Sequence, residues 1–441
     1  MFKMKKLSTL LLSVAMMSII VTGCGGTKTE TEGAVNSVPE GTKSEDAKAE
    51  DTKATGNTEF WLDKLGDQAI IDQLTLVWKN DSGIDVKIVN YPDVAAYQTS
   101  LQQSIDDKSA PGMFTWWSGA QLETLAKNDK LEDLTAEWDN YIADGVSADI
   151  KEAFTIDGKV YAAPYSVLYN TCIYNKKVFE KAGIADTPKT FDEFLADCEK
   201  IKQTGVTPIG LKNDSWASFI WFEQLIAAYE PQLYLDICNG TKTYTDESVK
   251  KVMEIWRDMF AKGYFAKPQA YADMTKTFAK GEIAIMLEPN PTANSLVLEY
   301  GLDSGNDFDS FVVPSMNGQK STIFFEASPI CVAKASKDKA AAIAALRNFY
   351  KPDTQNVMLN ENGIANTSTV TVSNMTIQNI LKMTADSDKY QLYLRYYENT
   401  PEDIRNYALD ELSRFMYSGA DINEVLGNIQ KKADEVFKSL K

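Results

Sequence analysis

The chain begins with an apolar run behind a positive head. Three lysines within the first six residues precede residues 7–21, which are apolar apart from small Ser and Thr residues. This order of positive head, apolar core and small residues is typical of a secretory signal. The run is shorter than the roughly 20 residues that span a bilayer as a helix. We therefore expect residues 1–23 to be a cleaved signal peptide and the mature chain to work outside the cytoplasm.

The next segment lacks apolar periodicity of any kind. Residues 24–57 consist mainly of Thr, Glu, Lys, Gly, Ser and Ala, with almost no large apolar side chain. Such a segment cannot bury enough surface to offset the entropy cost of folding. We predict a flexible tether here, with folded sequence beginning near Thr58.

Strand and helix patterns alternate through the first part of the folded sequence. Apolar or alternating stretches predict strands at 59–62, 84–89 and 113–117, and helical spacing predicts helices at 67–79 and 97–105. Ser118 is predicted to cap a further helix that runs through Leu122 and Leu125. Alternation of this kind indicates a layered α/β domain.

Helical spacing dominates the second part of the chain. It predicts helices in 179–181, 191–202, 218–229 and 248–262, with strands at 283–287 and 329–333. The tail at 401–441 predicts two amphipathic helices separated at Ser418-Gly419.

Composition and charge narrow the class of partner. A chain of 441 residues that is 44% hydrophobic supports a large core, which we expect to be divided between two domains. Removing the signal takes away three of the 45 basic residues and none of the 62 acidic ones, leaving a net charge near −20. Such a surface repels phosphate backbones and anionic headgroups, so we expect no nucleic-acid partner. An acidic ligand is also disfavoured by the negative net charge of the chain, although a local basic pocket could still bind one.

Histidine is absent from the chain. This excludes a Ser-His-Asp or Cys-His catalytic apparatus and any histidine-ligated metal. Cys172, Cys198, Cys238 and Cys331 are widely spaced, without a C-x-x-C pair, so we expect neither a metal site nor a cofactor. Export permits disulfides, but a chain of this size does not need them, and buried free thiols are the preferred interpretation.

The end of the presumed signal, Val21-Thr22-Gly23-Cys24, resembles the lipobox of bacterial lipoproteins. The resemblance implies that a lipid is attached to the sulfur of Cys24 and that cleavage makes Cys24 the N-terminus. The alternative is an ordinary signal with an incidental cysteine. Several acyl chains, each contributing about 0.8 kcal/mol per buried methylene, would anchor the protein to the outer face of the cell membrane.

Six later segments together resemble the family of ABC-transporter extracellular solute-binding proteins that includes maltose-binding protein. They are Gly158–Pro164, Tyr174–Ile184, Pro188–Phe194, Gly205–Ile209, Phe278–Met286 and Ala340–Tyr350. Their order and spacing across most of the mature chain make the set specific. One departure concerns the site: the family's version of the fifth segment ends in Ala-Met and is often followed soon by Gly and Trp, whereas Leu287-Glu288-Pro289-Asn290-Pro291 follows here. A commonly used ligand-stacking Trp is therefore missing.

The resemblance implies an α/β, two-lobed periplasmic-binding-protein-like fold (type II), with the lobes joined by hinge strands. The N-terminal lobe would comprise 58–166 plus 328–365, and the C-terminal lobe 167–327 plus 366–441. The implied function is capture of a carbohydrate, with an oligosaccharide as the expected ligand, by closure of the cleft. The chain, a monomer, would then deliver the ligand to the permease subunits of an ABC importer.

A sugar presents C–H-rich ring faces and a rim of hydroxyls, so its site needs aromatic platforms and polar or charged rim groups. Trp117 is the leading candidate, because it ends a predicted strand where ligands bind in open α/β sheets and where the family places a stacking Trp. Trp116 should face the opposite side. Trp61 ends the first strand, and Trp216 lies in a polar loop before a helix. For each candidate the alternative is packing in the core.

Four further residues complete the candidate ligand site. Tyr165 follows Pro164 at the expected hinge, and Glu326 and Glu288 could accept hydrogen bonds from sugar hydroxyls. Trp221 lies inside a helix, where its spacing with Leu225 suggests packing instead. The remaining helical tryptophans are interpreted as core residues: Trp78, Trp138 and Trp256.

Other classes of function also fit the sequence. A glycosidase needs two carboxylates about 5–5.5 or 6.5–9.5 Å apart, and 62 acidic residues supply pairs without favouring this chemistry. We expect no enzymatic activity. A binding protein for a non-sugar solute, or a sensory lipoprotein that reports its ligand to a membrane receptor, would show the same sequence features.

Overall fold

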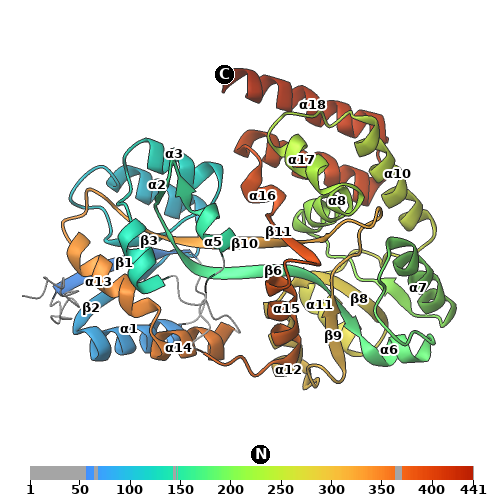
Figure 1. Cartoon of the computed structure of the whole chain (residues 1–441), viewed down its shortest axis with the longest axis horizontal. Helices are drawn as coiled ribbons and strands as arrows, with labels where there is room; N and C mark the ends of the chain where they lie inside the picture. Colours follow the sequence, from blue (N-terminus) through green and yellow to red (C-terminus); the bar gives the residue numbers. More distant parts are fainter. Residues whose placement is uncertain (1–55, 64–67, 143–145, 147, 363–369, 441) are drawn as a thin grey trace, which may run out of the picture. The chain divides into compact units, whose positions relative to one another are not determined.

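The computed structural model describes residues 56–63, 68–142, 146, 148–362 and 370–440 (Figure 1). The predicted signal peptide, Cys24 and nearly all of the predicted tether lie outside these residues. Eleven named strands occur in this described part of the chain: β1 (Gly56–Leu62), β2 (Ile84–Asn90), β3 (Met113–Thr115), β4 (Thr155–Ile156), β5 (Lys159–Val160), β6 (Ala163–Asn175), β7 (Thr207–Ile209), β8 (Ile283–Pro289), β9 (Phe308–Phe311), β10 (Ser321–Val332) and β11 (Tyr390–Leu394).

The helices up to the middle of the chain are α1 (Gln68–Ser82), α2 (Val94–Ser104), α3 (Ala120–Lys127), α4 (Thr135–Glu137), the π-helix η1 (Trp138–Ile142), α5 (Ala148–Ala153), α6 (Lys176–Lys181), α7 (Phe191–Gln203) and α8 (Trp216–Tyr229). Those that follow are α9 (Pro231–Cys238), α10 (Glu247–Ala261), α11 (Tyr271–Ala279), α12 (Pro291–Tyr300), α13 (Lys339–Phe349), α14 (Pro352–Asn362), α15 (Met375–Ala385), α16 (Tyr396–Asn399), α17 (Glu402–Ser418) and α18 (Ile422–Ser439).

Two parallel groups of strands are connected through long antiparallel strands. The main sheet has the order β2-β1-β3-β10-β6-β8-β7, with β11 paired to β10 and β9 paired to β6. Strand β1 is parallel to β2 and β3, and β7 is parallel to β8. Because parallel neighbours end at the same edge, each group gathers its carboxyl ends on one side.

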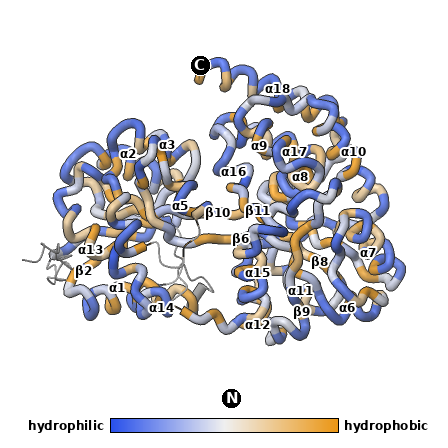
Figure 2. Tube along the Cα trace, in the orientation of Figure 1, coloured by the Kyte–Doolittle hydropathy of each residue, from blue (hydrophilic) through white to orange (hydrophobic). Residues whose placement is uncertain are grey.

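Strands β6 and β10 cross from one group to the other (Figure 1). Near their middle Glu326 pairs with Leu168, and the register shifts between Ser328 and Pro329. The β3 side of the sheet packs in one hydrophobic core and the β8 side in a second, while Ile283 and Met286 of β8 pack in a smaller third cluster. In Figure 2 the residues of β8 and β10 are mainly apolar, as expected for strands that are covered on both faces.

The first core gathers side chains from residues 60–169 together with residues 312–358 and Ile380, and the second gathers side chains from residues 172–287 together with residues 311–324 and 396–433. Trp78, Trp138 and Trp256 are at most 1% exposed within these cores, which confirms their interpretation as packing residues. The residue boundaries given above for the two lobes stay a prediction.

Most predicted elements are present, and local signals explain several of them. Helix α7 begins where Thr190 accepts a hydrogen bond from the backbone N–H of Glu193, as an N-cap residue does. Helices α17 and α18 are separated at Gly419, whose φ of 66° favours glycine, so the predicted break in the tail is confirmed.

The prediction around Ser118 was wrong. Strand β3 ends at Thr115 and α3 begins at Ala120, with Gly119 at the N-cap position and no side-chain cap. Gly119 has φ 68° and ψ −139°, a conformation that glycine adopts with little strain and other residues rarely do. The chain turns at this glycine, one residue later than a cap at Ser118 requires.

The predicted strand at 329–333 proved to be the end of the much longer β10. The pattern also gave no strand for β6, although this is a 13-residue element. Both strands are buried on two faces over most of their length, so their sequences lack the polar–apolar alternation by which a half-exposed strand is recognised.

Candidate functional site

A string of aromatic rings lies at the carboxyl ends of β1, β2 and β3. The ring centroids of Trp61 and Tyr91 are 5.4 Å apart, and those of Tyr91 and Tyr97 are also 5.4 Å apart. Tyr97 in turn contacts Trp116 and Trp117 at 6.1 and 6.3 Å. Trp61 and Trp117 are half-buried, whereas Trp116 is only 5% exposed. The two neighbouring tryptophans differ in exposure, but their ring centroids are 5.0 Å apart and both contact Tyr97. The prediction that Trp116 faces the opposite side was therefore wrong, because β3 ends at Thr115 and strand alternation does not extend to the two tryptophans.

Hydrogen bonds hold these rings in place. The indole Nε1–H of Trp61 donates to Glu59 at 2.8 Å, and Glu59 also pairs with Lys87 at 2.7 Å. The hydroxyl of Tyr97 donates to the backbone oxygen of Thr115, and burial raises the pKa of this phenol well above its usual value. Tyr97 is thus a neutral, fixed support behind Trp117.

The corresponding edge of the second group carries Trp216. This residue begins α8, just after the loop that follows β7, and is 38% exposed. One face of its indole stacks on Tyr397 of α16, with centroids 4.8 Å apart and planes inclined by 25°. Trp216 and Tyr397 thus form a partly exposed aromatic pair. Of the two residues, only Trp216 was proposed from the sequence.

Glu288 lies near the end of β8 and is 3% exposed. Its carboxylate pairs with Lys212 at 3.2 Å, and the Lys212 ammonium is 3.9 Å from Asp214. Burial raises the pKa of Glu288 to about 7, although the neighbouring Lys212 opposes the rise. Glu288 is therefore a buried, paired carboxylate behind the edge.

Tyr271, at the start of α11, is a further aromatic residue near Glu288 that sequence reasoning missed. It is 37% exposed and its hydroxyl donates to Thr292 at 3.0 Å. Its only signal in the sequence is an aromatic side chain at a helix start.

Glu326 takes part in a charged cluster around Arg395. Arg395 is 5% exposed and pairs with Glu326 at 2.8 Å and with both oxygens of Glu398 at 3.0 and 2.6 Å. Burial alone would disfavour the charge of Arg395, but Glu326 and Glu398 outweigh it, so the pKa of Arg395 is raised. The guanidinium also lies 5.2 Å from the ring centre of Trp216. Arg395 and Glu398 were not found from the sequence, because their pairing depends on the fold.

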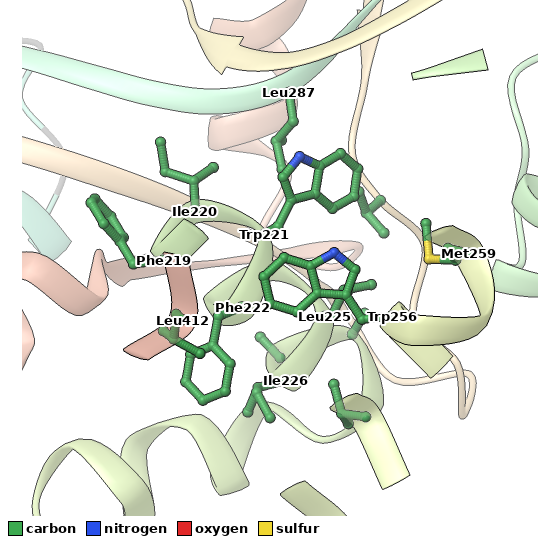
Figure 3. Close-up of a cluster of buried hydrophobic side chains, with 14 of the residues drawn as sticks. Phe219, Ile220, Trp221, Phe222, Leu225, Ile226, Trp256, Met259, Leu287 and Leu412 are labelled. Carbon is green, nitrogen blue, oxygen red and sulfur yellow. The ribbon is translucent and has the colours of Figure 1, made fainter. Parts of the chain in front are cut away.

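Two sequence candidates lie inside the cores. Tyr165 is 3% exposed and stacks on Phe349 with centroids 5.9 Å apart. Trp221 is 2% exposed and meets Phe265 edge-on at 5.0 Å. Figure 3 shows Trp221 surrounded by apolar side chains such as Leu287. Every residue of α8 from Ala217 to Ala228 is buried, which gives Trp221 a packing role. Neither ring is exposed, and we leave both out of the candidate site.

The remaining cysteines are Cys172, Cys198, Cys238 and Cys331; all four are free and buried, as predicted. Burial raises the pKa of each thiol, so little thiolate forms at neutral pH. Within the described residues we found no group of three or more acidic or cysteine side chains arranged to hold a metal ion. In that same part of the chain no helix combines the length and apolarity needed to cross a membrane.

The chain is similar in sequence to several known binding proteins. It is 25% identical over 272 residues to the diacetylchitobiose binding protein DasA of Streptomyces coelicolor, a match that covers 60% of this chain and 63% of that protein. It is 26% identical over 240 residues to the alpha-glucosides-binding periplasmic protein AglE of Rhizobium meliloti, covering 51% and 50%. A third relative, the sn-glycerol-3-phosphate-binding periplasmic protein UgpB of Brucella melitensis, is 25% identical over 46% of this chain and 48% of its own length. The matched region therefore spans less than two thirds of each of these three relatives.

Solved structures share the fold. A chitin oligosaccharide binding protein superposes with a TM-score of 0.73 at 20% identity, covering 87% of this chain and 99% of that one. The bacterial solute receptor AcbH gives a TM-score of 0.72 at 20% identity, covering 87% and 100%. These likenesses confirm the predicted two-lobed α/β fold of solute-binding proteins. The family model of the bacterial extracellular solute-binding protein matches residues 70–382, more than half of the chain. The chain belongs to the family of bacterial extracellular solute-binding proteins.

Proposed function

We propose that the chain captures a carbohydrate, best an oligosaccharide, between its two lobes and delivers it to the permease of an ABC importer. The observation that carries this proposal is the placement of Trp61, Trp117 and Trp216. All three are at least partly exposed, and they lie at the carboxyl ends of parallel strands in both groups of the sheet. Flat aromatic faces at this edge suit the C–H-rich faces of sugar rings.

The charges near these rings favour a neutral ligand. Arg395 is already paired with Glu326 and Glu398, and Lys212 with Glu288. An anionic solute would have to compete with a buried carboxylate for either cation, at a cost in free energy. The names of two relatives, which refer to diacetylchitobiose and to alpha-glucosides, support a saccharide. The third, named for sn-glycerol-3-phosphate, keeps a non-sugar solute as the alternative.

Ligand screening tests the proposal. Purified protein is mixed with diacetylchitobiose, longer chitin and xylan oligosaccharides, alpha-glucosides, galactose and sn-glycerol-3-phosphate, and its melting temperature and Trp fluorescence are recorded. We expect a saccharide to raise the melting temperature, because a ligand that binds only the folded state at 100 times its Kd adds about 2.7 kcal/mol of stability. A response to glycerol phosphate alone would contradict the sugar assignment.

The family is one of binding proteins, and we propose that the ligand is released unchanged. Chromatography of each responding saccharide after prolonged incubation checks this point, and the appearance of shorter products would contradict it. We further propose that the chain acts as a monomer, held on the extracytoplasmic face of the cell membrane by a lipid on Cys24.

A further inference from the structure

A backbone contact joins the loop after Trp117 to helix α16. Gly119 lies so close to this helix that a Cβ placed on it would be 2.0 Å from the carbonyl oxygen of Glu398. Helices α3 and α16 are in contact at this point. Leu122 of α3 packs in the first core and Tyr396 of α16 packs in the second, so the contact connects the two cores outside the crossing strands.

The position of the Glu398 backbone is fixed by Arg395. The Arg395 side chain donates to both carboxylate oxygens of Glu398, and the backbone N–H of Glu398 donates to the carbonyl of Arg395 at 3.1 Å. Arg395 is in turn bound to β10 twice: its side chain pairs with Glu326, and its backbone N–H donates to Phe325 at 3.1 Å. Helix α16 is therefore tied through one side chain to the strand that crosses between the groups.

A second carboxyl group, on α8, is hydrogen-bonded to the backbone of α16. Glu223 of α8 is fully buried and accepts a hydrogen bond from the backbone N–H of Tyr396 at 2.5 Å. Burial raises the pKa of Glu223 well above its usual value, although the Tyr396 N–H and Arg395 oppose the rise. The ion pairs of the Arg395 guanidinium are made with Glu326 and Glu398, so those two carboxylates determine where it lies.

The contact is flanked by candidate ligand platforms. Trp117 is two residues before Gly119, and Tyr397, which stacks on Trp216, is the residue before Glu398. Any change in the approach of Gly119 to Glu398 therefore changes the spacing between these aromatic groups.

We propose that Arg395 is a positioning residue: by holding Glu398 it places the carbonyl that Gly119 meets, and this contact sets the closest approach of the Trp117 loop to the Trp216–Tyr397 pair. The absence of a side chain at Gly119 is then a requirement of lobe closure as well as of the turn. The proposal does not depend on the identity of the ligand, and its test needs no ligand.

The test measures the distance between the two groups directly. Spin labels are attached to cysteines introduced at Thr124 of α3 and Asp403 of α17, two exposed positions on either side of the contact. The native thiols of the described residues are buried. Pulsed electron resonance then gives the distance distribution in the ligand-free protein. In Gly119→Ala the new Cβ needs about 1.5 Å more room than the contact offers, so we expect a shift to longer distances.

Gly158→Ala is the matched control. Gly158 also has a positive φ, of 78°, but a Cβ there would meet nothing within 4 Å. This variant also places a Cβ on a backbone with positive φ but creates no clash, and its distance distribution should coincide with that of the unsubstituted protein. Equal distributions for the two variants would overturn the proposal.

The role of Arg395 is tested by a second pair of variants, which also serves if Gly119→Ala fails to fold. Arg395→Met combined with Glu398→Met removes both charges of this pair and leaves the net charge of the chain unchanged. Its control is Arg414→Met with Glu411→Met, another Arg–Glu pair three residues apart, on α17. We expect a broadened or shifted distance distribution in the first double variant alone. An unchanged distribution at normal melting temperature would show that Arg395 does not position α16.

Discussion

The carboxylate of Glu288, near the end of β8, lies 3.2 Å from the ammonium of Lys212. Lys212 follows β7 in the sequence, and β7 is the parallel neighbour of β8. Glu288 is 3% exposed, and its pKa is about 7 in the folded protein against an ordinary value of 4.5. A buried ion pair of this kind makes the stability of the protein depend on pH.

Stability should fall as the pH rises through 7. Between pH 4.5 and 7 the folded protein keeps the Glu288 proton that the unfolded chain has lost, and raising the pH removes it. From pH 5.5 to 8 this costs about 2 kcal/mol of unfolding free energy. Because other groups also titrate, the measurement is the difference in stability between the unsubstituted protein and Glu288→Gln, by urea unfolding at both pH values. The Gln variant should gain relative stability at pH 8, and a constant difference would contradict the prediction.

Replacing Trp117 by Ala should weaken ligand binding with little loss of stability. The indole is half-buried at the strand end, so its removal takes away a platform without opening a large cavity. We expect at least a tenfold rise in Kd for the saccharide found by screening, which corresponds to about 1.4 kcal/mol. Isothermal titration measures the effect. Tyr407→Ala, which removes an aromatic ring that is 39% exposed on α17, is the control and should leave Kd unchanged.

Replacing Trp221 by Ala should lower stability strongly and leave ligand affinity nearly unchanged. The ring is 2% exposed within the second core, and loss of a large buried aromatic side chain costs about 3–5 kcal/mol. We expect a much lower denaturation midpoint, and a Kd within about threefold of the original at a temperature where the variant is folded. A large loss of affinity at unchanged stability would contradict this prediction and indicate that Trp221 contacts the ligand.

Replacing Cys24 by Ser should release the protein from the membrane. If Cys24 carries the lipid, the variant lacks the acyl chains that hold the mature chain on the membrane. The fraction of protein in washed membranes, measured by immunoblot, should fall strongly, with the released protein in the soluble extracytoplasmic fraction. Cys172→Ser, which alters a buried thiol in β6, is the control. Equal membrane fractions for both variants would refute lipidation at Cys24.

Much of the fold was visible in local patterns. The amphipathic tail with its break at Gly419, the strand ending near Trp61 and the helix after Thr190 each follow from residues close together in the chain. These signals suffice because a period of two or of 3.6 residues, a cap and a left-handed glycine act over a few positions. The crossing strands β6 and β10 left no such signal, since they are covered on both faces.

The residues of the candidate site also differ in whether local sequence could identify them. Trp61, Trp117 and Trp216 could be proposed from the sequence because the first two end predicted strands and the third lies in a polar loop before a predicted helix. Whether a large ring is exposed depends on what packs against it. Helical spacing already favoured packing for Trp221, whereas only the structure placed Tyr165 in a core.

By itself the sequence determined the class of the chain: an α/β body rich in aromatic residues, strongly acidic, without histidine and with the ordered segments of a solute-binding family. The tertiary structure alone decided which charges are already neutralised and which backbones touch. Arg395 meets Glu326 across 69 positions of sequence, and Gly119 meets Glu398 across 279. Contacts between such distant residues depend on how the strands and helices pack, and the neighbours of either residue along the chain do not determine this.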